Sequence, residues 1–302
     1  SASASASRTL KPDHRLLARS LACFRRAAAI AGDGATAVAA FPLAAVGLGL
    51  MLRMLHVIAQ CDSDAEFAEW ANVALDKHEG RDSEALFEQA IAADPYIPSA
   101  YIAMGQLRVD VASRVRALAA EGGGSFEESG TGMSEMEAER AYTQAAADAR
   151  HCFALALALD QHTAVPHFAL ARLCHEDALR ASVDAALAQR HARALIAAGD
   201  AFTEHDIALE EEICRRAAIA AVRECAAAKG HYEAALRTNR YHAPSWFWLG
   251  MLQIDVEDDA EGAEQSFLSA AKADPTMGPP HNHLAVLLFH RGGKQEAEEL
   301  YR

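Results

Sequence analysis

The chain has 302 residues and a formal net charge of −14, and 51% of its residues are hydrophobic but only 7% aromatic. Much of the apolar content is alanine, and alternation of apolar and polar residues is rare, so the sequence favours helices over strands. The acidic balance argues against nucleic acid as the main partner, because contacts to phosphates need clustered Lys and Arg.

The N-terminal segment, residues 1–31, is basic. Residues 1–53 carry seven basic and two acidic side chains, a net charge of +5, which leaves −19 for the rest of the chain. A basic stretch that is poor in acids, as between Arg8 and Arg26, is typical of a mitochondrial presequence, although an ordinary basic surface helix has the same composition. We therefore expect a mitochondrial location; a soluble protein of an organelle or of the cytoplasm is the alternative.

An apolar helix is predicted over residues 32–60. Residues 35–52 carry no charge, and as a helix they would be ~27 Å long, close to the ~30 Å hydrocarbon core of a bilayer. The apolar character continues to residue 58, and Arg53 could extend its charge to the membrane surface. We predict a single span of the inner membrane, with lipid contact through residues 35–58 and no buried partners in this chain. Six alanines, one proline and two glycines in the stretch weaken this interpretation and leave a buried core helix as the alternative.

A pattern of five positions with fixed separations occurs four times between residues 87 and 285. It consists of an aromatic residue, an Ala three residues later, a helix-ending position five after that, an anchor residue six further on, and a small residue four beyond. The copies are Phe87, Ala90, Pro95, Tyr101 and Gly105; Phe153, Ala156, Gln161, His167 and Ala171; Tyr232, Ala235, Arg240, Trp246 and Gly250; and Phe267, Ala270, Pro275, His281 and Ala285.

Each position has a physical role. The aromatic residue and the Ala share one face of a helix, because residues i and i+3 are neighbours there. A proline ends the helix, and the small residue lets two helix backbones approach each other. A unit of this kind cannot bury its apolar face alone, so the units must stack.

These positions resemble the tetratricopeptide repeat (TPR), a 34-residue helix–turn–helix. The resemblance covers roughly residues 65–302 and is strongest over residues 228–302. Three features depart from it: one extra residue in the turn at residues 256–262, Gln161 and Arg240 in place of Pro, and no turn within residues 209–230, which we expect to form one long helix. The resemblance implies an all-α fold, a right-handed superhelix of stacked antiparallel helix pairs.

Residues 121–135 interrupt the helical pattern. Their glycines and acids predict a mobile acidic loop. It is either a solvated insertion or an arm that becomes ordered when a partner binds.

Catalytic and metal-binding patterns are missing from the sequence. It contains no Gly-rich phosphate loop, GxSxG or HExxH, and its six cysteines include no CxxC pair. His281 and His283 would point about 200° apart on a helix, which is poor geometry for chelation. We predict a chain that is not an enzyme, with no cofactor, no metal and no small-molecule substrate.

A binding groove follows from the resemblance. In TPR proteins ligands lie on the concave surface, at positions one, five and eight after each anchor. Five of the six positions after the last two anchors are apolar, which predicts a groove for a hydrophobic segment. The six residues are Phe247, Met251, Ile254, Asn282, Val286 and Phe289. The alternative is that another part of this chain fills the groove.

The last predicted helix, residues 294–302, forms the end of the array. Ala297, Leu300 and Tyr301 are expected to pack inward and to leave an edge on which a next helix would lie. We hypothesise that a partner subunit docks on this edge, or that the natural protein continues beyond Arg302.

The sequence thus predicts a non-catalytic scaffold for protein–protein interaction. The leading hypothesis is a membrane-tethered accessory or assembly subunit of a large mitochondrial complex. The alternative is a soluble TPR adaptor that binds short segments of partner proteins.

Overall fold

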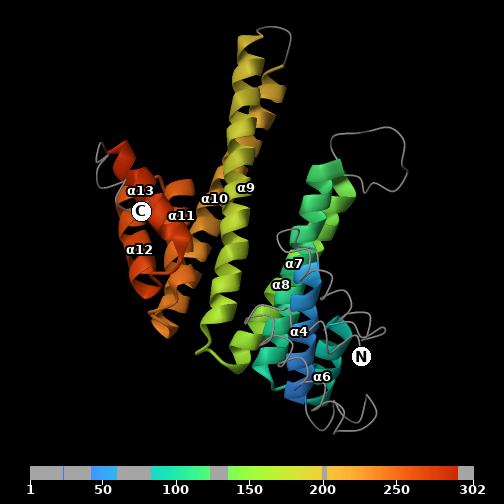
Figure 1. Cartoon of the computed structure of the whole chain (residues 1–302). Helices are drawn as coiled ribbons and strands as arrows, with labels where there is room; N and C mark the ends of the chain where they lie inside the picture. The colour runs from blue at the N-terminus through green and yellow to red at the C-terminus, as the bar shows by residue number, and fades with distance from the viewer. Residues whose placement is uncertain (1–22, 24–41, 60–82, 123–134, 199–202, 292–302) are drawn as a thin grey trace. The chain divides into compact units, whose positions relative to one another are not determined.

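The computed structural model describes residue 23 and residues 42–59, 83–122, 135–198 and 203–291 (Figure 1). Within these ranges the chain forms helices and no strand. The helices are α4 (Pro42–Ala59), α6 (Ser83–Ala93), α7 (Pro98–Gly122), α8 (Glu135–Leu159), α9 (Ala164–Ala197), α10 (Glu204–Thr238), α11 (Ala243–Asp255), α12 (Ala260–Ala273) and α13 (Gly278–His290). The chain divides into two compact units, Ser1–Gln161 and His162–Arg302, and each consists of packed helix pairs.

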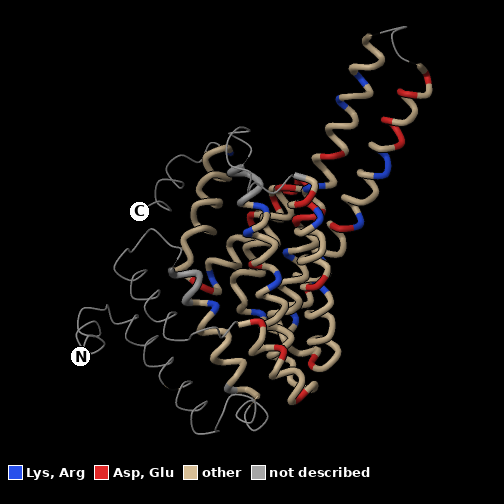
Figure 2. Tube along the Cα trace, turned by 90° about the vertical axis from the view of Figure 1, so that its right-hand side faces the viewer, with Lys and Arg blue, Asp and Glu red and all other residues tan. Residues whose placement is uncertain are grey.

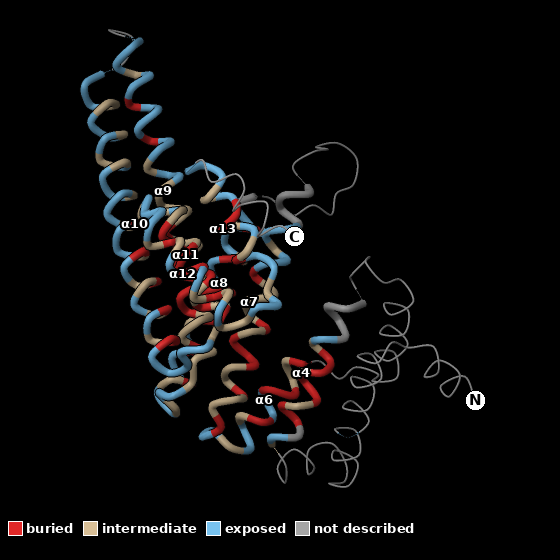
Figure 3. The backbone as a smooth tube through the Cα atoms, turned by 60° about the vertical axis from the view of Figure 1, so that its left-hand side comes forward, coloured by how far each residue is buried: buried red, intermediate tan, exposed pale blue. Residues whose placement is uncertain are grey.

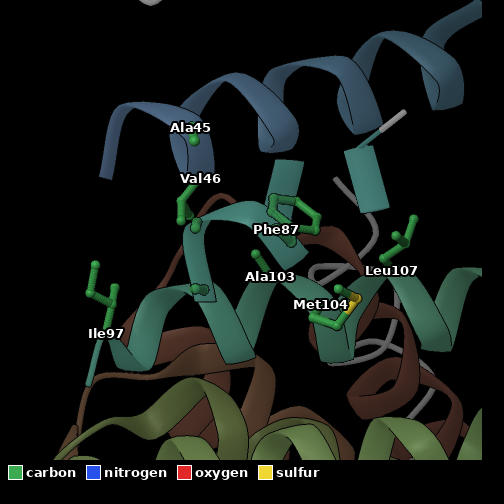
Figure 4. Close-up of a cluster of buried hydrophobic side chains, with 9 residues drawn as sticks. Ala45, Val46, Phe87, Ile97, Ala103, Met104 and Leu107 are labelled. Atoms are coloured by element: carbon green, nitrogen blue, oxygen red, sulfur yellow. The ribbon is translucent and has the colours of Figure 1, made fainter. Parts of the chain in front are cut away.

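The first unit contains two helix pairs, α4 with α6 and α7 with α8. Val46 of α4 and Phe87 of α6 belong to the same buried apolar cluster in the core of this unit (Figure 4). The Phe87 ring is fully buried and lies so close to Gly49 of α4 that a Cβ on this glycine would be 2.5 Å from a ring carbon. Gly105 of α7 meets the Phe153 ring of α8 in the same way, at 2.7 Å. In both pairs, therefore, a glycine on the first helix makes room for an aromatic ring of the second.

The structure does not support the predicted membrane span over residues 32–60. None of the helices in the described part of the chain is long and apolar enough to cross a membrane. Instead, α4 packs against α6 and α7, and five of its apolar side chains are buried: Ala45, Val46, Leu48, Met51 and Leu52 (red in α4 in Figure 3). The prediction of a helix without buried partners is therefore wrong for α4, and lipid contact through residues 35–58 is not supported. A helix that packs against two others needs apolar residues on most of its circumference, as a membrane helix does.

Arg53 also differs from its predicted role. Its guanidinium forms an ion pair with Asp110 of α7 and donates a hydrogen bond to Gln106 Oε1 at 3.1 Å. The charge that was expected to reach a membrane surface thus joins α4 to α7. The first helix pair begins at Pro42, and the predicted bounds of the repeat region, residues 65–302, stay a prediction.

The second unit contains the long pair α9–α10, the short pair α11–α12, and α13, which packs on α12. Helices α9 and α10 have 34 and 35 residues, so the single long helix predicted over residues 209–230 is confirmed. Helix α11 contributes to two apolar clusters. One joins it to α9 and α10 around Tyr232, and the other joins it to α12 and α13 around Phe267. Gly250 of α11 makes room for the Phe267 ring, since a Cβ there would be 2.7 Å from a ring carbon.

The four predicted copies of the repeat are confirmed in position. Their aromatic residues are all fully buried, and each lies on the second helix of a pair. Each second helix ends two residues before the predicted helix-ending position, and four residues then lead to the next helix. After the helix end, a backbone N–H donates to the carbonyl of the repeat's Ala at 2.8 to 3.0 Å in every copy.

Helix α10, which has Arg240 in place of proline at the helix-ending position, ends in the same way because Asn239 supplies the turn. The side chain of Asn239 accepts a hydrogen bond from the backbone N–H of Tyr241 at 3.0 Å. Asp94 and Asp274 accept the equivalent bond at the same distance, next to Pro95 and Pro275. Such side-chain turns favour the end of a helix with or without proline.

Several predictions concern residues outside the described ranges. They are the basic segment 1–31 apart from Cys23, most of the acidic loop 121–135, and the edge formed by Ala297, Leu300 and Tyr301. The right-handed superhelix is a property of the whole chain. All of these stay predictions.

Candidate functional site

The α11–α13 face is the name we give to the six residues of the predicted groove. Phe247 is buried, and its ring centroid lies 5.7 Å from that of Phe267 and 5.5 Å from that of His283. Met251 and Ile254 of α11 are half-buried. Phe247 therefore belongs to the core beneath the face rather than to its surface.

Helix α13 supplies the exposed part of this face. Asn282 is exposed, and Val286 and Phe289 expose 44% and 55% of their surface. Val286 and Phe289 are three residues apart, so they are neighbours on one side of the helix. Leu284 packs in one apolar cluster with Phe267 of α12, and Ala285 is also buried, which fixes the direction in which Val286 and Phe289 can point. The most exposed apolar surface of the predicted groove thus lies on α13.

A charged and aromatic cluster joins α9 to α11. The guanidinium of Arg172 lies 3.3 Å from the ring centroid of Trp248, a cation–π contact, and 3.5 Å from the carboxylate of Glu176. Arg172 and His175 are five and eight residues after the anchor His167, so they occupy the positions that form the groove in the resembled repeat. The prediction considered only the last two anchors and missed them.

His175 is the buried polar member of this cluster. The Nδ1 atom of His175 lies 3.4 Å from Tyr232 Oη, and its Nε2 atom lies 3.6 Å from a carboxylate oxygen of Asp255. Burial, and then the nearby Arg172 charge, lower the pKa of His175 to about 4, so the imidazole is neutral at neutral pH. Burial also raises the pKa of Asp255 and of Tyr232. The cluster therefore provides one fixed positive charge, on Arg172, beside carboxylates.

The described residues were also compared with the requirements of a metal site. No group of three or more His, Cys, Asp or Glu side chains is placed there to hold a metal ion. The close pair His167 and His231, with 3.3 Å between their Nδ1 atoms, has no third such ligand.

No protein-family model and no curated protein matches the chain. Similar solved structures exist at low sequence identity. One is a crystal structure of YrrB, described as a TPR protein with an unusual peptide-binding site; it is 12% identical, the alignment covers 81% of this chain and 87% of YrrB, and the TM-score is 0.37. Another is a monomeric mutant of IFIT1 with Gppp-AAAA; it is 13% identical, the alignment covers 94% of this chain and 54% of that chain, and the TM-score is 0.44.

Stacked helix pairs and four in-phase copies of the repeat decide the fold class. The fold is TPR-like. The glycine–aromatic contacts within three of its helix pairs are the structural form of the spacing seen in the sequence.

Proposed function

We propose that this chain is a protein-interaction scaffold of the adaptor type, which binds a segment of a partner protein on the α11–α13 face. The observation that carries the proposal is the exposure of Val286 and Phe289 on a helix whose opposite side is buried. Apolar side chains at this spacing are suited to a partner segment that brings its own aliphatic or aromatic side chains. Half-buried Met251 and Ile254 on α11 extend the same surface.

Position-specific photo-crosslinking tests this proposal. A photo-reactive phenylalanine analogue at Phe289 should form adducts with a partner protein in cells, and mass spectrometry would identify the partner segment. The same analogue at Leu268 of α12, which is also exposed and apolar, is the matched control and should form few. The double variant Val286→Asp/Phe289→Asp should lose the partner identified in this way, while Leu268→Asp should keep it. Equal retention by both variants would contradict the proposal.

The alternative occupant is this chain itself, since residues 292–302 follow α13 directly. In that case a variant without residues 292–302 would bind the identified partner more tightly than the full chain. The membrane-tethered form of the scaffold is not supported, because α4 packs in the core of the first unit. A mitochondrial location, a role in assembly of a complex and docking on the edge at Ala297, Leu300 and Tyr301 stay predictions.

A further inference from the structure

Helices α9 and α10 extend past α11, α12 and α13 as a two-helix arm (Figures 1 and 3). We define the arm as residues 179–197 of α9 and 204–224 of α10. The apolar cluster that joins this pair to α11 ends at Ala178 and Cys225. At 1.5 Å per residue the arm is ~28 Å long. Its two helices therefore pack mainly on each other.

The packing of the arm places small side chains inside and large ones outside. Ala188, Ala192 and Ala221 are buried between the helices. The exposed large apolar side chains of the arm are Val183, Leu187, Ile196, Leu209, Ile213, Ile219 and Val222. A helix pair that folds as an independent element buries its largest apolar side chains, because they contribute most to the hydrophobic effect. The arm thus leaves uncovered the side chains that would stabilise it most.

Three of these side chains lie on one side of the arm. Two antiparallel helices in contact are related by a two-fold axis perpendicular to the plane that contains both helix axes. This axis exchanges the helices but keeps each side of that plane. A residue one position before an inward-facing residue therefore lies on the same side of the pair, whichever helix it belongs to. Leu187 precedes the buried Ala188. Leu209 and Ile213 precede Glu210 and Cys214, both of which are less exposed than they are. We call Leu187, Leu209 and Ile213 the arm face.

Val222 lies on the opposite side, because it follows the buried Ala221 instead of preceding it. It is 71% exposed, whereas the three residues of the arm face are 43% to 53% exposed. Exposure alone therefore does not distinguish the two sides. Val222 is a matched control for substitutions in the arm face.

The two helices of the arm carry net charges of opposite sign. The α9 part has three arginines and one aspartate, a net charge of +2, and the α10 part has six acids and three arginines, a net charge of −3. Charges of both signs follow one another along the arm in Figure 2. Asp184 and Arg216 also precede inward positions, Ala185 and Ala217, so their side chains belong to the side of the arm face.

We propose that the arm face binds the arm of a second copy of this chain and forms a four-helix bundle. A two-fold axis along the arm places α9 of one copy against α10 of the other. The connection between α9 and α10 lies between Ala197 and Glu204. A residue of α9 and a residue of α10 that are equally far from it in sequence therefore lie at the same height along the arm. Leu187 then meets Ile213 of the second copy, and Asp184 meets Arg216 of the second copy. Arg216 already pairs with Glu212 of its own helix, but its side chain is 78% exposed and can be shared.

The size of the arm face fits a weak dimer. Two helices side by side, each about 10 Å across, give a face of about 500 Å² per copy over the ~28 Å length. The total of about 1,000 Å² is at the lower limit for a specific interface. We therefore expect a concentration-dependent dimer rather than an obligate one.

Sedimentation equilibrium of the full chain over a range of concentrations tests the proposal. The wild type should approach twice the mass of one chain. Leu209→Glu/Ile213→Glu should be monomeric throughout, because each dimer would bury four carboxylates. Val222→Glu should dimerise as the wild type does. Circular dichroism of each variant checks that its helix content is unchanged.

A charge exchange tests the arrangement of the two copies. Asp184→Arg and Arg216→Asp should each weaken the dimer about tenfold, since each substitution acts twice across the two-fold axis. The double variant Asp184→Arg/Arg216→Asp should return to within about threefold of the wild type. A monomeric wild type at ~100 µM, a dimer that survives Leu209→Glu/Ile213→Glu, or no recovery in the double variant overturns the proposal. None of these measurements involves Val286 or Phe289, so their outcome is independent of partner binding on the α11–α13 face.

Discussion

The short pair α11–α12 and the long pair α9–α10 differ in what lies between their helices. In the short pair Gly250 receives the fully buried Phe267 ring, and little of either helix extends beyond that contact. The base of the long pair has a comparable centre, where Tyr232 is fully buried beside the repeat's Ala171. Beyond Ala178 and Cys225 the long pair continues without an aromatic residue in its interior.

The difference teaches that the repeat positions determine the core and not the length of the helices. Where an aromatic ring packs against a small residue of the neighbouring helix, the pair has a well-packed centre. Where the helices run on past it, alanines hold them together and the large side chains stay at the surface. We expect stability to be concentrated at the base and binding capacity to be available on the arm.

The largest effect expected from this comparison is the loss of a central ring. Phe267→Ala removes a fully buried side chain and should lower the free energy of unfolding of the second unit by about 3–5 kcal/mol. Ile219→Ala in the arm removes an exposed side chain and should change it by less than about 0.5 kcal/mol. Urea unfolding followed by circular dichroism measures both. Similar losses for the two variants would show that the arm is as well packed as the base.

The second prediction concerns pH, and it again separates base from arm. The pKa of His175 falls from 6.5 to about 4 on folding, so the fold holds the neutral imidazole. As the pH falls from about 6.5 to about 4, the unfolded chain binds the proton first, and the second unit should lose about 3 kcal/mol of stability. Burial lowers the pKa of His167, His231 and His242 as well, which acts in the same direction.

Unfolding at pH 7 and pH 4.5 measures this loss. His175→Gln keeps a polar group near Tyr232 but cannot be protonated, so its stability should vary much less with pH. The exposed His205→Gln at the end of the arm is the control and should keep the wild-type dependence. Burial raises the pKa of Asp255 above its ordinary value of 3.8, which acts with the opposite sign because the folded state binds this proton first, so it offsets part of the loss. A wild-type pH dependence in His175→Gln would contradict the assignment.

The third prediction compares two glycines. A Cβ at Gly250 would be 2.7 Å from the Phe267 ring, and Gly250→Ala should lower the free energy of unfolding by about 1–3 kcal/mol through overpacking. A Cβ at Gly230 of α10 would have no atom within 4 Å, and Gly230→Ala should raise it by about 0.5–1 kcal/mol because alanine favours the helix. Thermal unfolding of both variants checks the opposite signs. A neutral Gly250→Ala would mean that the close contact is not what fixes α11 on α12.

The sequence predicted the later helix pairs better than the first one, and the reason is spacing. Gly250 and Phe267 lie close in sequence, so the repeat pattern includes both. Gly49 and Phe87 make the same contact across a long insertion, which removes the pattern. Composition alone then assigned α4 to a membrane. A usable signal was present, since Pro42 precedes Gly49 by seven residues, as Pro98 precedes Gly105.

The candidate site was predicted in part for a similar reason. Val286 and Phe289 follow from positions counted along one helix. The contact of His175 with Tyr232 joins residues 57 positions apart, and no local pattern encodes it. Phe247 stands at a groove position in the sequence, but the rings of Phe267 and His283 from two other helices bury it. Which side chains of a face stay open depends on tertiary packing.

The smallest expected effect lies in the turn between α11 and α12, where the sequence has one residue more than the resembled repeat. The turn accommodates the extra residue with a left-handed backbone conformation at Asp258, whose φ is 55°. Glycine adopts this region without strain and aspartate at a modest cost, so Asp258→Gly should raise the free energy of unfolding by about 0.5 kcal/mol. Gln265→Gly, within the neighbouring α12, should lower it by about 1 kcal/mol, because glycine is unfavourable inside a helix. Differential scanning calorimetry of the two variants resolves the signs. A loss of stability in both would show that the Asp258 side chain, and not its backbone conformation, stabilises the turn.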